Sequence, residues 1–190
     1  ICEASHHLND LIGNILDLAM IEAGRMDLDL GEVDLAALIS DSVNIGIINA
    51  SDSEVEVVTD VSAAIGPIQA DERRIRQILF NLVSNAMRFT EAGGKVSISA
   101  DLMGDTVKLV VSDNGRGIPA EQQATRFDSF TSSDQRGAGL GLALVKHFVQ
   151  LHGGNVGIKS IEGEGTEVVC WLPTQARPAD GSDKGTTLAP

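Results

Sequence analysis

Two glycine-containing stretches carry the residues best suited to chemistry. The first, DNGRGI at residues 113–118, follows an apolar, β-branched run, Val107 to Val111, that is typical of a strand. Its carboxylate, Asp113, could read a base, and its glycines permit positive φ and close approach of a ligand to the backbone. The second, GAGLGL at residues 137–142, leads into a helical pattern. A glycine-rich turn that opens a helix offers free N–H groups and a positive dipole end to phosphate.

A predicted helix at residues 72–89 supplies a third group. Asn81, Asn85 and Arg88 are spaced i, i+4 and i+7, so they line one face. Two amides and a guanidinium suit a metal–phosphate unit, because amide oxygens are hard ligands for magnesium. The alternative is a solvated helix face. Asn85 lies within an apolar run, which makes a simple surface position less fitting.

Other chemical motifs find little support. The chain has no G-x-x-x-x-G-K-[ST], and its second glycine stretch is neither G-x-G-x-x-G nor preceded by a strand. The histidines are scattered. His147 and His152 are predicted to be a helix-surface and a helix-end residue, and His6-His7 lacks a flanking base and proline turn.

Alternating helices and strands must position these groups. Apolar spacing predicts helices at 3–23, 34–49, 72–89 and 139–152, with Asp34 and Asp71 as N-caps. Strands are predicted at 54–61, 95–100, 106–112, 155–160 and 166–172, with a short one within 65–70. The third helix should bury an aliphatic stripe opposite a polar face, part of it near the apolar edge: Arg73, Arg74, Gln77, Asn81, Asn85 and Arg88.

The composition limits the kind of partner. The 190 residues carry a formal charge of −13, which argues against nucleic acid or anionic membrane as the main partner. Cys2 and Cys170 are far apart, so free or buried thiols are expected instead of a disulfide framework or zinc site. No apolar run approaches the ~18 residues of a membrane span. The chain lacks an initiator Met and begins inside a helical pattern, as expected for a piece of a longer protein, and a sensor or membrane segment upstream is left open.

The first predicted helix has a narrow apolar seam: Leu8, Leu11, Ile15 and Leu18. Such a seam is found either in a helix that packs into a domain core or in half of a helical hairpin that dimerises as a four-helix bundle. The narrowness of the seam and its terminal position favour the bundle.

Taken in order, the motifs resemble the catalytic, ATP-binding domain of bacterial sensor histidine kinases. The four signatures are N-x-x-x-N-x-x-R at 81–88, D-x-G-x-G at 113–117, F-x-x-F at 127–130 and G-x-G-L-G-L at 137–142. The flanks agree, since residues 71–81 resemble the approach to the family's asparagine box. Residues 16–24 resemble the end of the second helix of its dimerisation bundle, so the resemblance covers about Leu8 to Leu172.

The resemblance implies a Bergerat-type (GHKL) ATP-binding fold, an α/β (α+β) two-layer sandwich with a mixed sheet under helices. A helical dimerisation segment would precede it. The implied division is a partial bundle helix at 1–25, the ATP-binding catalytic domain at 26–173 and a disordered tail at 174–190.

The resemblance also implies roles for site residues. Asp113 would accept from the adenine amino group, and Asn85 would hold magnesium, with Asn81 and Arg88 near the phosphates. Gly115 and Gly117 would let the backbone approach the base, with Ile118 beside them. Two phenylalanines would anchor a mobile ATP lid, and the helix opening would cradle phosphate: Phe127 and Phe130, then Gly137, Gly139, Leu140, Gly141 and Leu142.

The implied function is donation of the γ-phosphate of Mg-ATP to a histidine, for relay to a response regulator. The family's acceptor, in a His-(Glu/Asp)-x-x-x-Pro context, would lie upstream of Ile1, so this fragment alone is not expected to autophosphorylate. A homodimer in the cytoplasm is expected, with the parent chain anchored in the inner membrane as one option. Six residues, Thr131 to Arg136, make a short lid. The short lid keeps a pseudokinase or nucleotide-sensing module open, and another GHKL-type ATPase is a further alternative.

Overall fold

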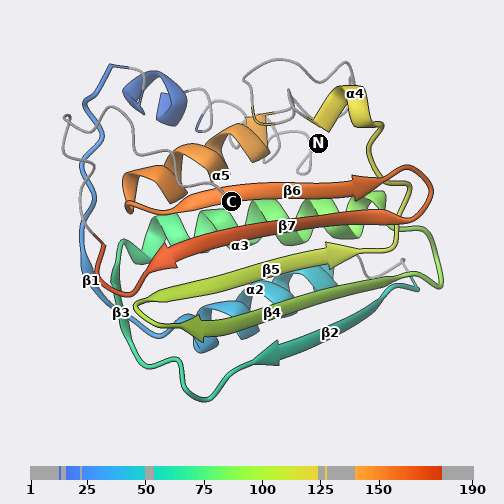
Figure 1. The fold of residues 1–190 in the computed structure, drawn as a ribbon, viewed down its shortest axis with the longest axis horizontal. Coiled ribbons are helices and arrows are strands. Elements are labelled where there is room, and N and C mark those ends of the chain that lie inside the picture. The colour runs from blue at the N-terminus through green and yellow to red at the C-terminus, as the bar shows by residue number, and fades with distance from the viewer. Residues whose placement is uncertain are drawn as a thin grey trace.

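A computed structural model describes residues 13, 16–21, 23–49, 54–123, 127 and 140–176. Its centre is a five-stranded mixed sheet with strand order β2-β4-β5-β7-β6 (Figure 1). The strands are β2 (Glu56–Val61), β4 (Lys95–Met103), β5 (Thr106–Asp113), β6 (Asn155–Ile161) and β7 (Gly165–Pro173). Strand β2 pairs parallel to β4, and the other neighbours pair antiparallel. The predicted mixed sheet is confirmed.

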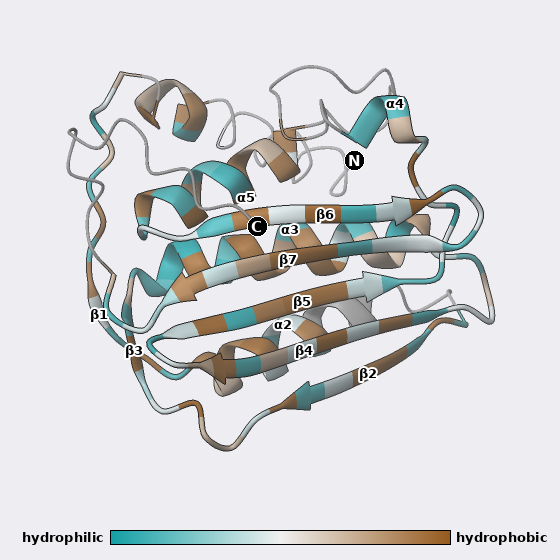
Figure 2. Ribbon diagram, in the orientation of Figure 1, coloured by the Kyte–Doolittle hydropathy of each residue, from teal (hydrophilic) through white to brown (hydrophobic). Residues whose placement is uncertain are grey.

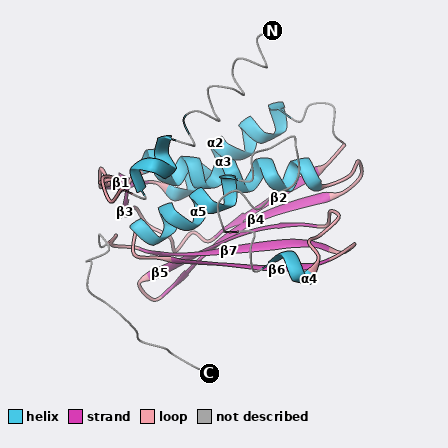
Figure 3. Cartoon of the chain, turned by 90° about the horizontal axis from the view of Figure 1, so that it is seen from above, coloured by secondary structure: helices cyan, strands magenta, loops and turns pink. Residues whose placement is uncertain are grey.

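Among the named helices of the described chain, the three long ones cover one face of this sheet (Figure 3). They are α2 (Leu35–Asn49), α3 (Glu72–Phe89) and α5 (Leu140–Leu151), and α3 contacts both of the others. The short helix α4 (Ala120–Gln123) contacts β6 at the edge of the sheet. The arrangement is the predicted two-layer sandwich. Helix α3 contacts both β5, which leads into the first glycine stretch, and α5, which follows the second.

The sequence explains where α3 begins and ends. Asp71 has extended backbone, and its side chain accepts a hydrogen bond from the Arg74 N–H at 3.1 Å, which satisfies a free donor of the first turn. At the other end the Thr90 N–H donates to the Ala86 carbonyl. Both bounds agree with the predicted helix. Its polar face is not uniformly solvated, however, because Arg74 and Asn81 are each only 9% exposed.

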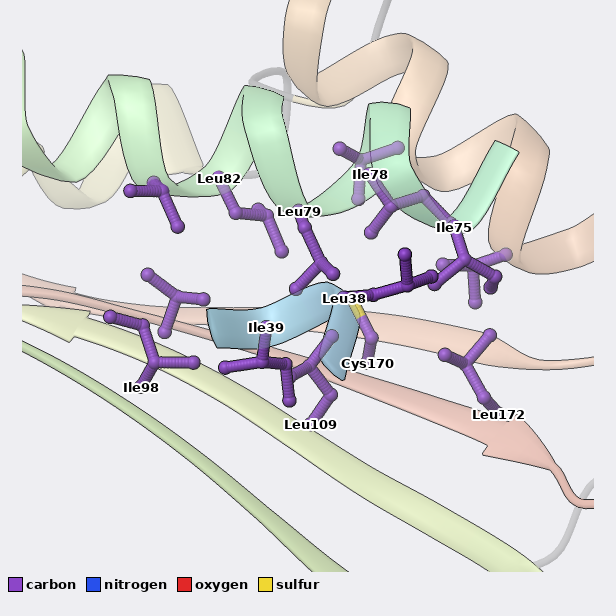
Figure 4. Packing of buried hydrophobic residues seen from close by; sticks show 14 of the residues in the cluster. Leu38, Ile39, Ile75, Ile78, Leu79, Leu82, Ile98, Leu109, Cys170 and Leu172 are labelled. Atoms are coloured by element: carbon purple, nitrogen blue, oxygen red, sulfur yellow. The ribbon is translucent and has the colours of Figure 1, made fainter. Parts of the chain in front are cut away.

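The core lies between the helices and the sheet (Figure 4). Hydrophobic positions recur along α3, β4, β5 and β7 (Figure 2). Alternate residues of β4 and β5 are buried, as expected for strands with one covered face. These apolar side chains pack across the two layers: Ile75, Ile78, Leu79 and Leu82 from α3, with Ile98, Leu109, Cys170 and Leu172 from the sheet.

A second, two-stranded sheet was not predicted. Strand β1 (Gly31–Val33) pairs antiparallel with β3 (Ile68–Ala70). Residues 174–176 continue from β7 along this sheet, since the Gln69 N–H donates to the Thr174 carbonyl and the Ala176 N–H to the Gln69 carbonyl. The predicted tail therefore begins in ordered structure, and its residues 177–190 lie outside the described part of the chain.

The described part of the first predicted helix, residues 16–21, packs against α3. Leu18 is buried in the domain core, and the Asp17 carboxylate lies 2.9 Å from the Arg74 guanidinium. The Arg74 guanidinium also lies 4.9 Å from the centre of the Phe148 ring on α5. Leu18 therefore has the core-packing environment, whereas the rest of the predicted seam lies outside the described residues. Among the described helices, none is long and apolar enough to cross a membrane.

Candidate functional site

Asp113 closes strand β5 and begins the loop of the first glycine stretch. Its Oδ1 accepts a hydrogen bond from the Gly115 N–H at 3.0 Å. It stands opposite Thr166 in the β5–β7 pairing. Burial raises the pKa of Asp113 above its ordinary value, while hydrogen bonds from the Gly115 and Thr166 backbone oppose that rise. A half-buried carboxylate at a strand end, already held by a backbone N–H, is suited to accept a hydrogen bond from a ligand.

The two glycines of this loop are required by close packing of the protein backbone. A Cβ at Gly115 would collide with the Phe89 carbonyl at the end of α3. Gly117 has a φ of 66°, and a Cβ there would collide with the Ile161 carbonyl at the end of β6. From the sequence, these glycines were explained by the close approach of a base to the backbone. The structure shows a second requirement, because the absence of a Cβ lets the Asp113 loop pack between the end of α3 and the β6–β7 turn.

The side-chain amides of Asn81 and Asn85 on α3 lie next to the first turn of α5. A Cβ built on Gly141 would lie 3.6 Å from the Asn81 Oδ1 and 3.7 Å from the Asn85 Nδ2, so both amides face this glycine. Among the described residues, the Asn81 Nδ2 is a buried side-chain atom with no hydrogen-bond partner. Buried polar groups are rarely left unpaired, so an unpaired amide beside a helix N-terminus suggests a ligand position.

These amides fit the magnesium that the family resemblance implies. An asparagine amide that is turned over presents its oxygen in place of the unpaired nitrogen, and amide oxygen is a hard ligand. Magnesium usually takes only one or two protein ligands and completes its shell with water and phosphate oxygens. Asn81 and Asn85 could supply such ligands, and Arg88, exposed on the same helix, could contact phosphate.

The predicted site residues fall into two groups joined by α3. Asp113, Gly115, Gly117 and Ile118 form the loop at its C-terminal end. Asn81, Asn85, Gly141 and the start of α5 form the second group. The Leu140 side chain is 2% exposed and belongs to the core, so a ligand could meet only its backbone. Leu142 packs partly against the core, and Phe127 is a half-buried turn residue. Phe130, Gly137 and Gly139 lie outside the described residues.

Sequence reasoning missed several residues around the Asp113 loop. The Phe89 ring lies under two guanidinium groups, with the Arg116 and Arg88 carbons 4.5 and 5.3 Å from its centre. Ser160 and Thr166 contribute hydroxyls from β6 and β7. Thr166 had a weak signal, since it follows a glycine turn at the start of a strand. Ser160 had none, because nothing in a β-branched strand marks a serine as a hydrogen-bonding centre.

Residues 70–176 match the family described as histidine kinase-, DNA gyrase B- and HSP90-like ATPase. The chain belongs to this ATPase family. Within it, the fold, the site and the relatives together define the ATP-binding catalytic domain of a sensor histidine kinase.

The relatives cover nearly all of this chain but only part of their own. An uncharacterised sensor-like histidine kinase of Rhizobium meliloti is 38% identical over 93% of this chain and 35% of its own length. Sensor protein DivL of Caulobacter vibrioides is 39% identical over 92% of this chain and 23% of its own. This chain thus spans about a third or less of these proteins.

Solved structures of histidine kinases are similar in fold to this chain. Full-length ShkA in complex with AMPPNP has a TM-score of 0.83 and 34% identity, covering 93% of this chain and 38% of that one. The catalytic domain of histidine kinase ThkA has a TM-score of 0.72 and 26% identity, covering 78% of this chain and 98% of that one.

Proposed function

We propose that this domain binds Mg-ATP and donates its γ-phosphate to a histidine on a separate helix, from which a response regulator takes it. The observation that carries the proposal is the buried Asn81 amide nitrogen, which has no hydrogen-bond partner in the described part of the chain and lies beside Asn85 and Gly141. Asn81 and Asn85 can contact a metal ion and phosphate, and they lie on α3, whose C-terminal end packs against the Asp113 loop. AMPPNP binding by the similar ShkA supports an adenine nucleotide as the ligand.

Each group then has a defined task. The Asp113 carboxylate accepts from the adenine amino group and orients the base. The free N–H groups at the start of α5 hold phosphate oxygens, aided by the positive end of the helix dipole. Arg88 adds a positive charge near the phosphates. Asn85 and Asn81 would hold magnesium, which when bound would neutralise phosphate charge. Phosphoryl transfer depends mainly on positioning and charge neutralisation, so these groups suffice to present a phosphoryl donor.

The whole-protein role is proposed on the same basis. Leu16 and Met20, one helical turn apart at residues 16–21, are 63% and 39% exposed. Exposed apolar residues at this spacing support packing against a further helix and a homodimer. We place the domain in the cytoplasm, where ATP and a response regulator are available to it. Light scattering on a longer chain would test the dimer, and a strictly monomeric result would contradict it.

Phosphotransfer is tested with a longer chain that includes the acceptor helix. Incubated with Mg-ATP, it should form an acid-labile, base-stable phosphohistidine, and Asn85→Ala should lose that product. Arg73→Ala, an exposed change in the first turn of the same helix and about two turns before Asn81, is the control. Magnesium-dependent ATP binding without phosphohistidine would instead favour a nucleotide-sensing pseudokinase.

A further inference from the structure

The hydroxyl of Ser160 on β6 has three polar neighbours. Its Oγ lies 2.8 Å from the Ile118 backbone nitrogen, 2.7 Å from the Gly165 carbonyl oxygen and 3.0 Å from the Thr166 Oγ1. These neighbours come from the loop after Asp113 and from the start of β7. One side chain therefore connects three strand ends of the site.

Counting hydrogens fixes the direction of every bond in this cluster. A serine hydroxyl has one hydrogen to donate and two lone pairs to accept. The Gly165 carbonyl can only accept, so Ser160 gives its hydrogen there. The Ile118 N–H can only donate. All three contacts are satisfied together only if Thr166 is the donor toward Ser160.

The consequence appears at Thr166. Its hydroxyl hydrogen is engaged by Ser160, so its remaining capacity is as a hydrogen-bond acceptor. Thr166 stands directly opposite Asp113 in the β5–β7 pairing, and directly opposed side chains of an antiparallel pair lie on one face. Its backbone also hydrogen-bonds to the Asp113 carboxylate. The part of the site proposed to hold the base thus presents two hydrogen-bond acceptors side by side, the Asp113 carboxylate and the Thr166 hydroxyl.

Ser160 also holds the loop that carries Ile118. The Gln123 side chain on α4 donates to the Ile118 carbonyl at 2.9 Å and to the Ser160 carbonyl at 2.7 Å. Both backbone polar groups of Ile118 are therefore bonded, the N–H by Ser160 and the carbonyl by Gln123. The loop next to Gly117 is held in place by β6 and α4 independently of any ligand.

We infer that Ser160 is a positioning residue which, by orienting the Thr166 hydroxyl, makes the site select a base edge that donates hydrogen bonds. This rests on the proposed nucleotide site at Asp113. A 6-amino purine presents donors to the two acceptors. A 6-oxo purine presents a lone pair that both Asp113 and the oriented Thr166 repel. Without Ser160, the Thr166 hydroxyl is free to turn and donate to a 6-oxo group, so discrimination falls.

The test compares ATP and GTP affinities by calorimetry in the wild type, Ser160→Ala, Thr166→Val and the double variant. Ser160→Ala should weaken ATP binding about 3- to 10-fold, the effect of one lost neutral hydrogen bond. It should also reduce the ATP:GTP ratio by a similar factor. Thr166→Val should reduce the ratio equally, and the double variant no further, because Ser160 acts on selectivity through Thr166. Thr166→Ser, which keeps the hydroxyl, should preserve the ratio.

Two controls keep the outcomes distinct. Ser99→Ala on β4, a half-buried serine away from the site, should leave both affinities unchanged. Thermal unfolding will show whether Ser160→Ala is folded, and if it is not, Thr166→Val and Thr166→Ser decide. A Ser160→Ala protein with the wild-type ratio, or a double variant with additive losses in the ratio, would overturn the inference while ATP binding stands. A wild-type protein that binds no adenine nucleotide would overturn both this inference and the proposed function.

Discussion

The backbone N–H of Asp71 donates a hydrogen bond to the Nε2 of His152, with 3.0 Å between the nitrogens. This bond ties the residue after α5 to the N-cap of α3, and His152 is 1% exposed. Its Nδ1 lies 2.7 Å from the Phe148 carbonyl, which can only accept. His152 therefore carries its hydrogen on Nδ1 and is neutral. It is a helix-end residue as predicted, but it is buried and bridges two helices.

The first prediction is that stability depends on pH through His152. The pKa of His152 lies below its ordinary value of 6.5, and burial is the largest cause of this shift. Between that lowered pKa and 6.5 the unfolded chain binds a proton that the folded chain does not. The free energy of unfolding should therefore rise with pH across this window. Chemical denaturation from pH 5 to 8 measures it, and His152→Gln should reduce the slope.

The assignment to His152 would be wrong if His152→Gln, folded as the wild type is, kept the wild-type pH slope.

The second prediction concerns the cost of keeping Asp113 ionised. Its raised pKa means that the folded state disfavours the carboxylate, so above that pKa the charge lowers stability. Asp113→Asn removes the charge and retains an acceptor oxygen for the Gly115 N–H. We expect the variant without nucleotide to be at least as stable as the wild type, as often occurs when a functional site is relieved, yet to lose adenine binding. Loss of both stability and binding would contradict this separation.

Gly141 and Gly115 should respond differently to alanine. A methyl group at Gly141 makes only ordinary contacts, at 3.6 Å from Asn81, and alanine favours a helix, so stability should hold or rise by up to about 1 kcal/mol. The methyl would stand between the amides and phosphate, and ATP affinity should fall about tenfold or more. Gly115→Ala would instead push against the Phe89 carbonyl and cost roughly 1–3 kcal/mol of stability.

Thermal unfolding and ATP titration of the two glycine variants together decide this point. If Gly141→Ala binds ATP as the wild type does, the opening of α5 is not the phosphate site.

Cys170 should be chemically inert in the folded protein. It is fully buried in the core, and burial raises the pKa of its thiol to about 12, so the reactive thiolate is scarce at neutral pH. In a Cys2→Ser background, a thiol reagent at pH 8 should label the native protein only at the rate of unfolding and label the denatured protein rapidly. Rapid labelling under native conditions would show that the core opens without global unfolding.

The elements that the sequence predicted well are those with strong local signals. The limits of α3 follow from an aspartate N-cap and a continuous aliphatic stripe, and the hairpin of β4 and β5 follows from alternation around Gly104, whose φ is 63°. Asp113 was found because it ends a strong strand and precedes glycines. Strand β1 was missed because three residues, Gly-Glu-Val, are too few to show a period of two.

The features that could not be predicted depend on partners distant in the chain. Arg74 was assigned to the polar face, but it is buried between Asp17 and the Phe148 ring. The roles of His152 and Ser160 depend on Asp71 and Ile118, at separations of 81 and 42 residues. No local spacing encodes such pairs, because the topology of the sheet and the packing of α3 on α5 bring them together.

The most direct test of the account is calorimetric titration of this domain with ATP, with and without magnesium, in the wild type, Asp113→Ala and Asn85→Ala. We expect micromolar binding by the wild type, no binding by Asp113→Ala, and binding by Asn85→Ala that magnesium no longer strengthens. A folded wild-type domain that binds no ATP, or an Asp113→Ala variant that binds it unchanged, would contradict an ATP site at Asp113 and the α3 amides.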